Sequence, residues 1–336
     1  MKQIYVIISL FLMVELQACM DEPDLRSDTP RGNFNALWEI IDTRYCYLSY
    51  KQINWDSVYT EYSHKIDTVS SNFSLFDVMG KMLATLKDGH VNLYSSFDRS
   101  RYWNWYTDYP SNFNSEVLFK PHYLGADYRI AGSLRYKKIA NGKVGYIYYG
   151  SFSDSFSNEN INQIFNSFSS CLGIIVDVRN NGGGMLSYAE QLASYFFDKK
   201  TLTGYLSHKT GTGHSDFSTP TPLYIEPNDK VKWNKKVMIL TNRMSYSATN
   251  GFVNIMKYAP NSTIIGDQTG GGGGLPFSSE LPNGWMVRFS SSPMYDADMQ
   301  NIEWGIKPDI QVNMNAEAEA RGYDTIIERA IGEIFK

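Results

Sequence analysis

A serine at the junction of a strand and a helix is the first candidate for chemistry in this 336-residue chain. Ser247 lies in VMILTNRMSYSAT, where an apolar strand-like run ends and a helical pattern begins near Ala248. A hydroxyl at such a junction has the amides of the first helical turn beside it, and the helix dipole favours negative charge there. The geometry is that of a nucleophile elbow, although the motif GxSxG is absent. A serine at this position is also a common helix N-cap, so both interpretations remain open.

A nucleophilic serine needs a base, and His90 is the best placed of the five histidines. It lies in LKDGHVNL, between a helical pattern and a strand-like run, and the Asp88-Gly89 turn could present its imidazole. An acid to orient the ring could come from Glu303 or Asp309 in NIEWGIKPDI. A turn histidine without a catalytic part is the alternative.

A glycine-rich loop, NNGGG, follows the buried strand LGIIVDVR and ends in Gly183 and Gly184. Glycines permit positive φ and let backbone N–H groups point into space, where they could bind a phosphate or an oxyanion. A phosphate is disfavoured because GxxxxGK[ST] is missing and no lysine follows. A plain tight turn is the remaining alternative.

Strand-like and helical segments alternate through the second half of the chain, which predicts an α/β fold with parallel strands and helical cover. The expected strands are 142–152, 172–179, 235–242, 262–267 and 284–295, and the expected helices are 158–168, 185–197, 247–259 and 323–335. Residues 34–45, 53–62 and 74–86 form an expected N-terminal helical group, with Ser74 as an N-cap. Residues 97–125 are irregular and aromatic.

The composition excludes several classes of protein. Hydrophobic residues make up 43% and charged residues 20%, which suits one large or two modest globular domains. A net charge of −4 provides no basic face for nucleic acid. No Cys/His cluster has zinc spacing, so no metal is expected. Cys46 and Cys171 do not make a disulfide framework, and Cys171 is expected to be a buried thiol.

The N-terminus is expected to be a targeting segment. The apolar run from Ile4 to Val14 is too short to cross a membrane, so residues 1–18 are interpreted as a signal peptide. Its ending, Leu-Gln-Ala-Cys19, resembles the bacterial lipobox, which implies that Cys19 carries a lipid and that residues 19–31 form a tether. The expected location is the cell envelope: outer membrane, periplasmic or surface-facing, with the membrane reached through the lipid anchor. An ordinary secretion signal is the alternative.

Five motifs in order resemble the C-terminal-processing (tail-specific) serine protease family. They are LKDGHVNL, GIIVDVRNNGGG, VMILTNRMSYSAT, TIIGDQTGGGGG and GIKPDI, and they cover nearly the whole chain after residue 32. The resemblance implies a crotonase/ClpP-like α/β core over residues 91–336 and a small N-terminal helical subdomain over 32–90. It also implies a cofactor-free serine peptidase with polypeptide substrates.

The resemblance assigns roles to individual residues. Ser247 is the nucleophile, and the N–H groups of Ala248 and of Gly183, or next Gly184, form the oxyanion hole. Asn250 stands where the family usually has Glu.

The identity of the base separates two branches of the family. The lysine of the processing proteases would fall at Gly272, and no lysine lies between Lys257 and Lys307. The branch similar to the tricorn core protease uses a histidine supported by a glutamate, which implies His90 and Glu303. That branch has a serine before the histidine, where this chain has Gly89, so the link from Glu303 to His90 is direct, bridged otherwise or absent.

The glycine run 270–274 and the aromatic segment are expected to shape the substrate groove. Gly271 and Gly272 replace the lysine region, so a peptide backbone is expected to pass close to them. Residues 92–142 are too few for a PDZ domain, which leaves substrate selection to the N-terminal helices and to Trp103 and Trp105. Two alternatives remain: an inactive relative that binds peptides or hydrophobic ligands, and a carbohydrate-binding lipoprotein that stacks sugars on the tryptophans.

Overall fold

The computed structural model describes residues 27–336, so the expected signal peptide and Cys19 lie outside the described residues. Three helices come first: α1 (Pro30–Arg44), α2 (Trp55–Ile66) and α3 (Asn72–Ala84). Helix α1 begins within the expected tether, because Pro30 occupies the first turn and Thr29 caps the Gly32 N–H. No helix among the described residues is long and apolar enough to span a membrane.

The cap of α3 differs from the prediction. Ser71 is the N-cap, and Ser74 stands three residues later, where its hydroxyl accepts from the Ser71 N–H. The two serines form a reciprocal capping box, so the expected N-cap Ser74 is wrong by one turn.

A seven-stranded sheet forms the main lobe, in the order β12-β9-β8-β5-β4-β3-β2. Within this sheet β4, β5, β8, β9 and β12 are parallel. Strands β2 and β3 are antiparallel additions that the sequence did not indicate. Their bounds are β2 Arg129–Ala131, β3 Leu134–Ile139, β4 Val144–Tyr148, β5 Gly173–Asp177, β8 Lys236–Thr241, β9 Ser262–Gly266 and β12 Ile310–Gln311.

Helices cover both faces of this sheet, as the continuous apolar strands require. Along β5, Ile174 and Val176 face one hydrophobic core and Ile175 faces the other. The first core contains α6 (Asn158–Ser167), α7 (Leu186–Ser194) and α8 (Ala248–Met256), and the second contains α5 (Ser115–Leu118) and α10 (Thr325–Phe335). The expected parallel α/β core is therefore confirmed.

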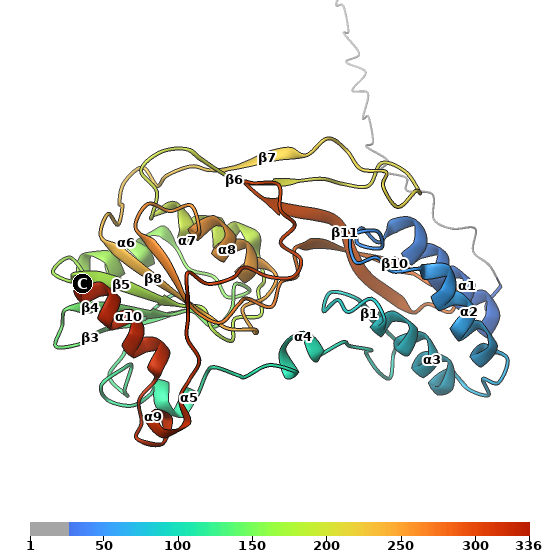
Figure 1. Cartoon of the computed structure of the whole chain (residues 1–336), viewed down its shortest axis with the longest axis horizontal. Coiled ribbons are helices and arrows are strands. Elements are labelled where there is room, and N and C mark those ends of the chain that lie inside the picture. The colour runs from blue at the N-terminus through green and yellow to red at the C-terminus, as the bar shows by residue number, and fades with distance from the viewer. Residues whose placement is uncertain (1–26) are drawn as a thin grey trace, which may run out of the picture.

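A second sheet joins the main lobe to the helical lobe (Figure 1). Its longest strand, β11 (Met286–Asp296), pairs at its start with β1 (Asn92–Tyr94) and from Met286 to Pro293 with β10 (Gly274–Glu280). The end of β11 pairs with β6 (Thr201–Leu206), which pairs with β7 (Thr221–Ile225). Short helices α4 (Asn104–Thr107) and α9 (Ala316–Ala320) complete the elements.

The helical lobe draws its core from both ends of the sequence. Leu37 of α1 and Met79 of α3 share one buried cluster with Leu93 of β1 and with Val287 and Phe289 of β11. Residues beyond 90 thus complete this lobe, so its spatial extent is wider than the expected 32–90 subdomain.

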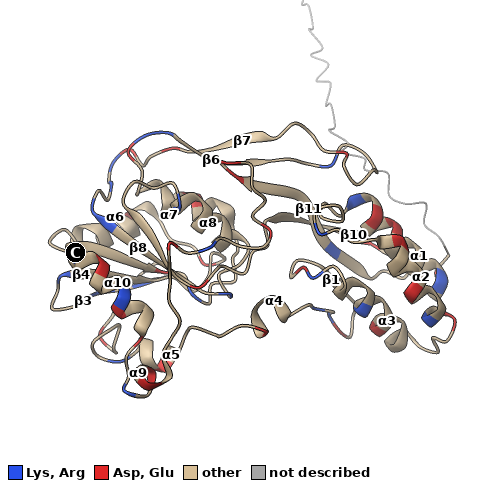
Figure 2. Cartoon of the chain, in the orientation of Figure 1, with Lys and Arg blue, Asp and Glu red and all other residues tan. Residues whose placement is uncertain are grey.

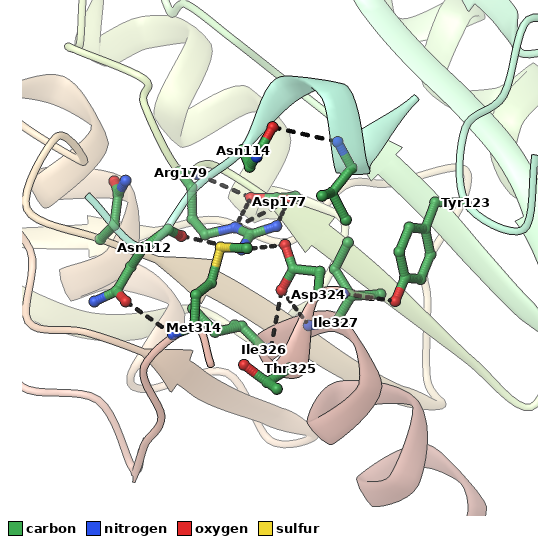
Figure 3. Close-up of polar contacts among 12 residues, drawn as sticks. Asn112, Asn114, Tyr123, Asp177, Arg179, Met314, Asp324, Thr325, Ile326 and Ile327 are labelled. Carbon is green, nitrogen blue, oxygen red and sulfur yellow. Dashed lines mark hydrogen bonds and ion pairs between the residues drawn. The ribbon is translucent and has the colours of Figure 1, made fainter. Parts of the chain in front are cut away.

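Charged residues of both signs are distributed over both lobes (Figure 2). The most buried ion pairs lie under the carboxyl edge of the main sheet (Figure 3). Arg179 is fully buried and pairs with Asp177 at 2.6 Å and Asp324 at 2.8 Å. Asp324 also caps α10, and the Arg179 guanidinium donates to the carbonyl of Asn112 at 3.2 Å. This cluster fixes the start of the glycine-rich loop to the last helix.

Candidate active site

Two loops leave the main sheet at the same edge and bring the candidate residues together. Strands β5 and β8 are adjacent and parallel, with Asp177 opposite Leu240 at their carboxyl ends. The glycine-rich loop follows β5, and the segment that leads to Ser247 follows β8. Ligands in open α/β sheets bind at such an edge.

Ser247 is half-buried and its backbone is unusual. It precedes α8 with φ 59° and ψ −120°, and its side chain caps no helical N–H. Its Oγ instead lies 2.9 Å from Nε2 of His90. Ser247 therefore occupies the N-cap position of α8 without capping the helix through its side chain.

His90 reaches Ser247 from the turn that follows α3. Its main-chain N–H donates to Asp88 Oδ1 at 2.8 Å, and its ring meets Tyr246 edge-on with centroids 5.0 Å apart. Burial lowers the pKa of His90 to about 4, against the opposing effect of Asp88 and with further lowering by Arg288 and Lys51. The imidazole is therefore neutral at physiological pH, as a general base must be.

The second ring nitrogen of His90 lacks the carboxylate that the sequence led us to expect. Nδ1 is buried and makes no hydrogen bond to any described residue. The main chain at Gly274 raises the pKa of the ring without meeting hydrogen-bond geometry, and this effect does not offset that of burial.

Glu303 makes no hydrogen bond to His90, so any support that it gives the ring is indirect. Its Oε1 lies 2.7 Å from Lys51 Nζ, and its Oε2 accepts the Gly273 N–H at 2.9 Å. Burial, and next the charge of Asp88, raise the pKa of Glu303 to about 8, although Lys51 opposes both.

Lys51 connects the two carboxylates. Its Nζ lies 3.7 Å from Asp88 Oδ2, an oxygen that also accepts from the hydroxyls of Tyr45 and Ser290, each at 3.0 Å. Burial alone would raise the pKa of Asp88, but Lys51 and then His90 and the hydrogen bonds hold it below its usual value. A chain of polar contacts thus runs from Glu303 through Lys51 to Asp88, and Asp88 accepts the main-chain N–H of His90.

Sequence reasoning missed Lys51 and gave Asp88 only a turn-forming role. Lys51 comes from the segment between α1 and α2 and meets Glu303 across 252 residues. No local motif marks such a contact. The Lys51 side chain is only 2% exposed, and the sequence gives no indication of this burial.

The candidate oxyanion donors surround Ser247. The N–H groups of Ala248 and Gly184 donate to no other group in residues 27–336, and Gly184 lines the cleft. The Gly183 N–H, however, already donates to Asn181 Oδ1 at 3.0 Å. A side chain on Gly183 would clash with the Tyr246 carbonyl at 2.7 Å, so glycine is required there.

The position of Gly89 explains the missing serine before the histidine. A Cβ there would lie 2.7 Å from Trp105 Nε1 and 2.8 Å from the Tyr246 hydroxyl. The rings of Trp105 and Tyr246 stack at 4.1 Å and occupy the space that a side chain would need.

The glycine run corrects another expectation, since Gly271 and Gly272 do not line a groove. Both are buried, and a Cβ would meet the Glu303 carbonyl at 1.9 Å from Gly271 and the Tyr246 ring at 2.5 Å from Gly272. The Gly271 carbonyl accepts the Ser247 N–H at 2.9 Å. The run therefore supports the main chain of Ser247, and neither Gly271 nor Gly272 is among the residues that line the cleft.

An open cleft of about 290 Å³ lies in front of Ser247 and His90. Trp103 and Trp105 both line it, and Trp103 is 43% exposed. The remaining lining comes from the glycine loop, β1, β11 and the segment after β1, and includes Gly182, Asn92, Tyr94, Tyr102 and three arginines.

Two other residues singled out in the sequence have structural roles. Asn250 is fully buried, donates to the Ile302 carbonyl and accepts from the Thr269 hydroxyl. Asp309 accepts the Ile264 N–H at the sheet edge, away from His90. Among residues 27–336, no group of three or more His, Cys, Asp or Glu could hold a metal ion.

Comparison with known proteins places the chain in a family. The sequence profile described as peptidase family S41 matches residues 143–312, just over half of the chain, and the tricorn protease C1 domain matches residues 27–84. A "Probable CtpA-like serine protease" of Staphylococcus epidermidis (strain ATCC 12228 / FDA PCI 1200) is 28% identical over 183 residues. Its counterpart in Staphylococcus aureus (strain COL) is 30% identical over 186 residues. Each match covers 54% of this chain but only 35% of the relative's length.

Solved structures resemble the chain over more of its length. A structure described as a "putative peptidase" from Parabacteroides merdae ATCC 43184 is 51% identical with a TM-score of 0.89, covering 92% of this chain and 98% of that one. Mature CPAF, at 13% identity and a TM-score of 0.67, covers 90% of this chain and 97% of its own, and shares the fold. The chain belongs to peptidase family S41.

Proposed function

We propose that this protein is a serine-type peptidase that hydrolyses peptide bonds, with Ser247 as nucleophile and His90 as general base. The observation that carries the proposal is the 2.9 Å contact between Ser247 Oγ and His90 Nε2 across 157 residues of sequence. A neutral histidine within hydrogen-bonding distance of a serine hydroxyl is the arrangement that general-base activation requires.

The proposed reaction follows from this geometry. Ser247 Oγ attacks the scissile carbonyl while His90 Nε2 takes its proton and returns it to the leaving amine. The developing oxyanion lies at the start of α8, where the Ala248 N–H and the dipole of the helix stabilise negative charge. Gly184 is the second donor that we favour, ahead of Gly183, because the Gly183 N–H already binds Asn181.

Glu303 supports the base indirectly in this proposal. Asp88 is the carboxylate whose charge favours the protonated form of His90, and Lys51 holds Asp88 and Glu303 together. Lys51, Asp88 and Glu303 are thus positioning residues, since they act through His90 and do not contact the reacting atoms.

We also propose that Cys19 anchors the protein to the cell envelope, which rests on the sequence before residue 27. A lipid at Cys19 predicts that the wild-type protein fractionates with membranes and incorporates radiolabelled palmitate. Cys19→Ala should then be released into the soluble fraction without label, and an unchanged membrane fraction would contradict the proposal.

Covalent labelling tests the nucleophile. A fluorophosphonate probe should label the wild-type protein, and Ser247→Ala should abolish the label because the attacking oxygen is gone. His90→Ala should slow labelling by about 10²-fold or more, the usual contribution of a general base. Labelling is measured by in-gel fluorescence and by the mass of the modified peptide.

Ser70→Ala is the matched control, because Ser70 is exposed and lies in the helical lobe, remote from the cleft. It should label like the wild type. Label that persists in Ser247→Ala would refute the assignment. Well-folded wild-type protein that never reacts would favour the alternative, an inactive relative that binds peptides or hydrophobic ligands.

The backbone of Ser247 predicts a conflict between stability and function. A non-glycine residue with φ 59° and ψ −120° is strained, typically by about 1–3 kcal/mol, whereas glycine tolerates this conformation. Ser247→Gly and Ser247→Ala both remove the contact with His90, so their difference isolates the backbone. We expect Ser247→Gly to be about 1 kcal/mol more stable to urea than Ser247→Ala, with neither labelled. A glycine variant that is no more stable than the alanine variant would show that Ser247 is unstrained.

A further inference from the structure

The cleft in front of Ser247 concentrates positive charge in a protein whose net charge is −4. Arg99, Arg101 and Arg288 line it, and its lining includes no Asp or Glu. The ring of Tyr94 lies under the Arg99 guanidinium at 5.7 Å, and that of Trp103 under Arg101 at 4.9 Å. None of the three arginines forms an ion pair with another residue in the described part of the chain, whereas Arg179 and Arg243 do.

The strand register shows why these side chains share one wall. Asn92 of β1 lies directly opposite Arg288 of β11, and Tyr94 bridges to Arg99 on its other side. Residues that lie opposite each other in an antiparallel pair, and residues two apart on one strand, project from the same face. The intervening Leu93 points the other way, into the core of the helical lobe. One face of this ladder is therefore packed, and the other presents cations to the cleft.

Arg288 lines the same cleft as the proposed base His90, and its charge adds to the effect of burial in lowering the pKa of His90. It is half-buried, so an anion that contacts it would be partly shielded from water. A guanidinium is a planar fork of N–H donors whose geometry matches a carboxylate, and charge-assisted pairs of this kind strengthen where water is excluded. Arg99 and Arg101 are exposed and stand on aromatic rings that orient them.

We propose that the arginine wall formed by Arg99, Arg101 and Arg288 is a subsite that binds a carboxylate of the peptide substrate near the scissile bond. This inference rests on the proposed peptidase function and adds a substrate class to it: peptides that carry a carboxylate within reach of Ser247. The carboxylate has two sources in a polypeptide, the free C-terminus and the side chain of Asp or Glu. Both present the same group to the guanidinium fork.

Peptide binding to Ser247→Ala protein tests the subsite without requiring turnover. Three N-acetylated hexapeptides share one alanine-leucine core: one has an amidated C-terminus, one a free C-terminus, and one an amidated C-terminus with a single internal glutamate. Binding is followed through tryptophan fluorescence, because Trp103 and Trp105 line the cleft. At least one carboxylate peptide should bind about tenfold or more tightly than the neutral one, as expected for a hydrogen-bonded charge pair. The peptide that binds more tightly than the neutral one identifies the source of the carboxylate.

Arginine variants in the Ser247→Ala background locate the effect. Arg288→Gln and Arg101→Gln should each reduce the preference for the carboxylate peptide at least severalfold while neutral-peptide binding changes little. The matched control is Arg129→Gln, which removes the same charge from an exposed arginine on β2 that forms no ion pair within residues 27–336, and it should keep the preference. Arg101 is exposed on an irregular segment, so its variant remains informative if Arg288→Gln fails to fold.

Two results would overturn the subsite. One is equal binding of all three peptides. The other is a carboxylate preference that survives both Arg288→Gln and Arg101→Gln. The fluorophosphonate label distinguishes failure of the subsite from failure of the peptidase function. If the wild type is labelled but shows no preference for a carboxylate, only the proposed subsite is refuted. If the protein is never labelled but binds peptides in a carboxylate-dependent way, the subsite is supported and the proposed peptide hydrolysis is refuted.

Discussion

The strained backbone of Ser247 is the constraint on which the site depends. With φ 59° and ψ −120°, the turn before α8 projects the hydroxyl into the cleft and leaves the Ala248 N–H beside it. Such a conformation persists only where its neighbours hold it. The Ser247 N–H donates to the Gly271 carbonyl at 2.9 Å, and the Tyr246 N–H donates to the Asn181 carbonyl at 3.1 Å. The nucleophile turn is thus clamped between the glycine run on one side and the glycine-rich loop on the other.

The five-glycine run acts through its backbone because side chains would not fit. Its backbone groups have different partners. The Gly271 carbonyl accepts the Ser247 N–H, the Gly273 N–H donates to Glu303, and the main chain at Gly274 raises the pKa of His90. In the lysine-dependent branch, by resemblance, this region carries the base. Here the base comes from the turn after α3, and the buried chain of Glu303, Lys51 and Asp88 links that turn to the run.

Local patterns predicted much of this protein. Continuous apolar segments followed by helical periodicity predicted the parallel core. Because two of the predicted strands end at the same edge of the sheet, Ser247 could be expected to lie near the glycine-rich loop. The family motifs predicted that His90 meets Ser247, but contacts between distant segments that no motif marks could not be predicted. The contact between Lys51 and Glu303 joins segments with no shared motif, and β10 begins within a glycine run that has no strand propensity. The same limitation misplaced Gly271 and Gly272, because only neighbouring backbone shows that they are buried.

The protonation state of His90 tests the central claim most directly. For Ser247 to be activated, Nε2 must accept the serine proton, so the neutral ring must carry its hydrogen on Nδ1. Nitrogen-15 NMR of histidine-labelled protein, assigned with His90→Gln, reports the tautomer and the titration together. The proposed mechanism requires a neutral ring with an unprotonated Nε2 at pH 6, and we expect a pKa shifted from 6.5 to about 4 by burial. A ring that is protonated at pH 6, or one whose hydrogen resides on Nε2, would contradict it.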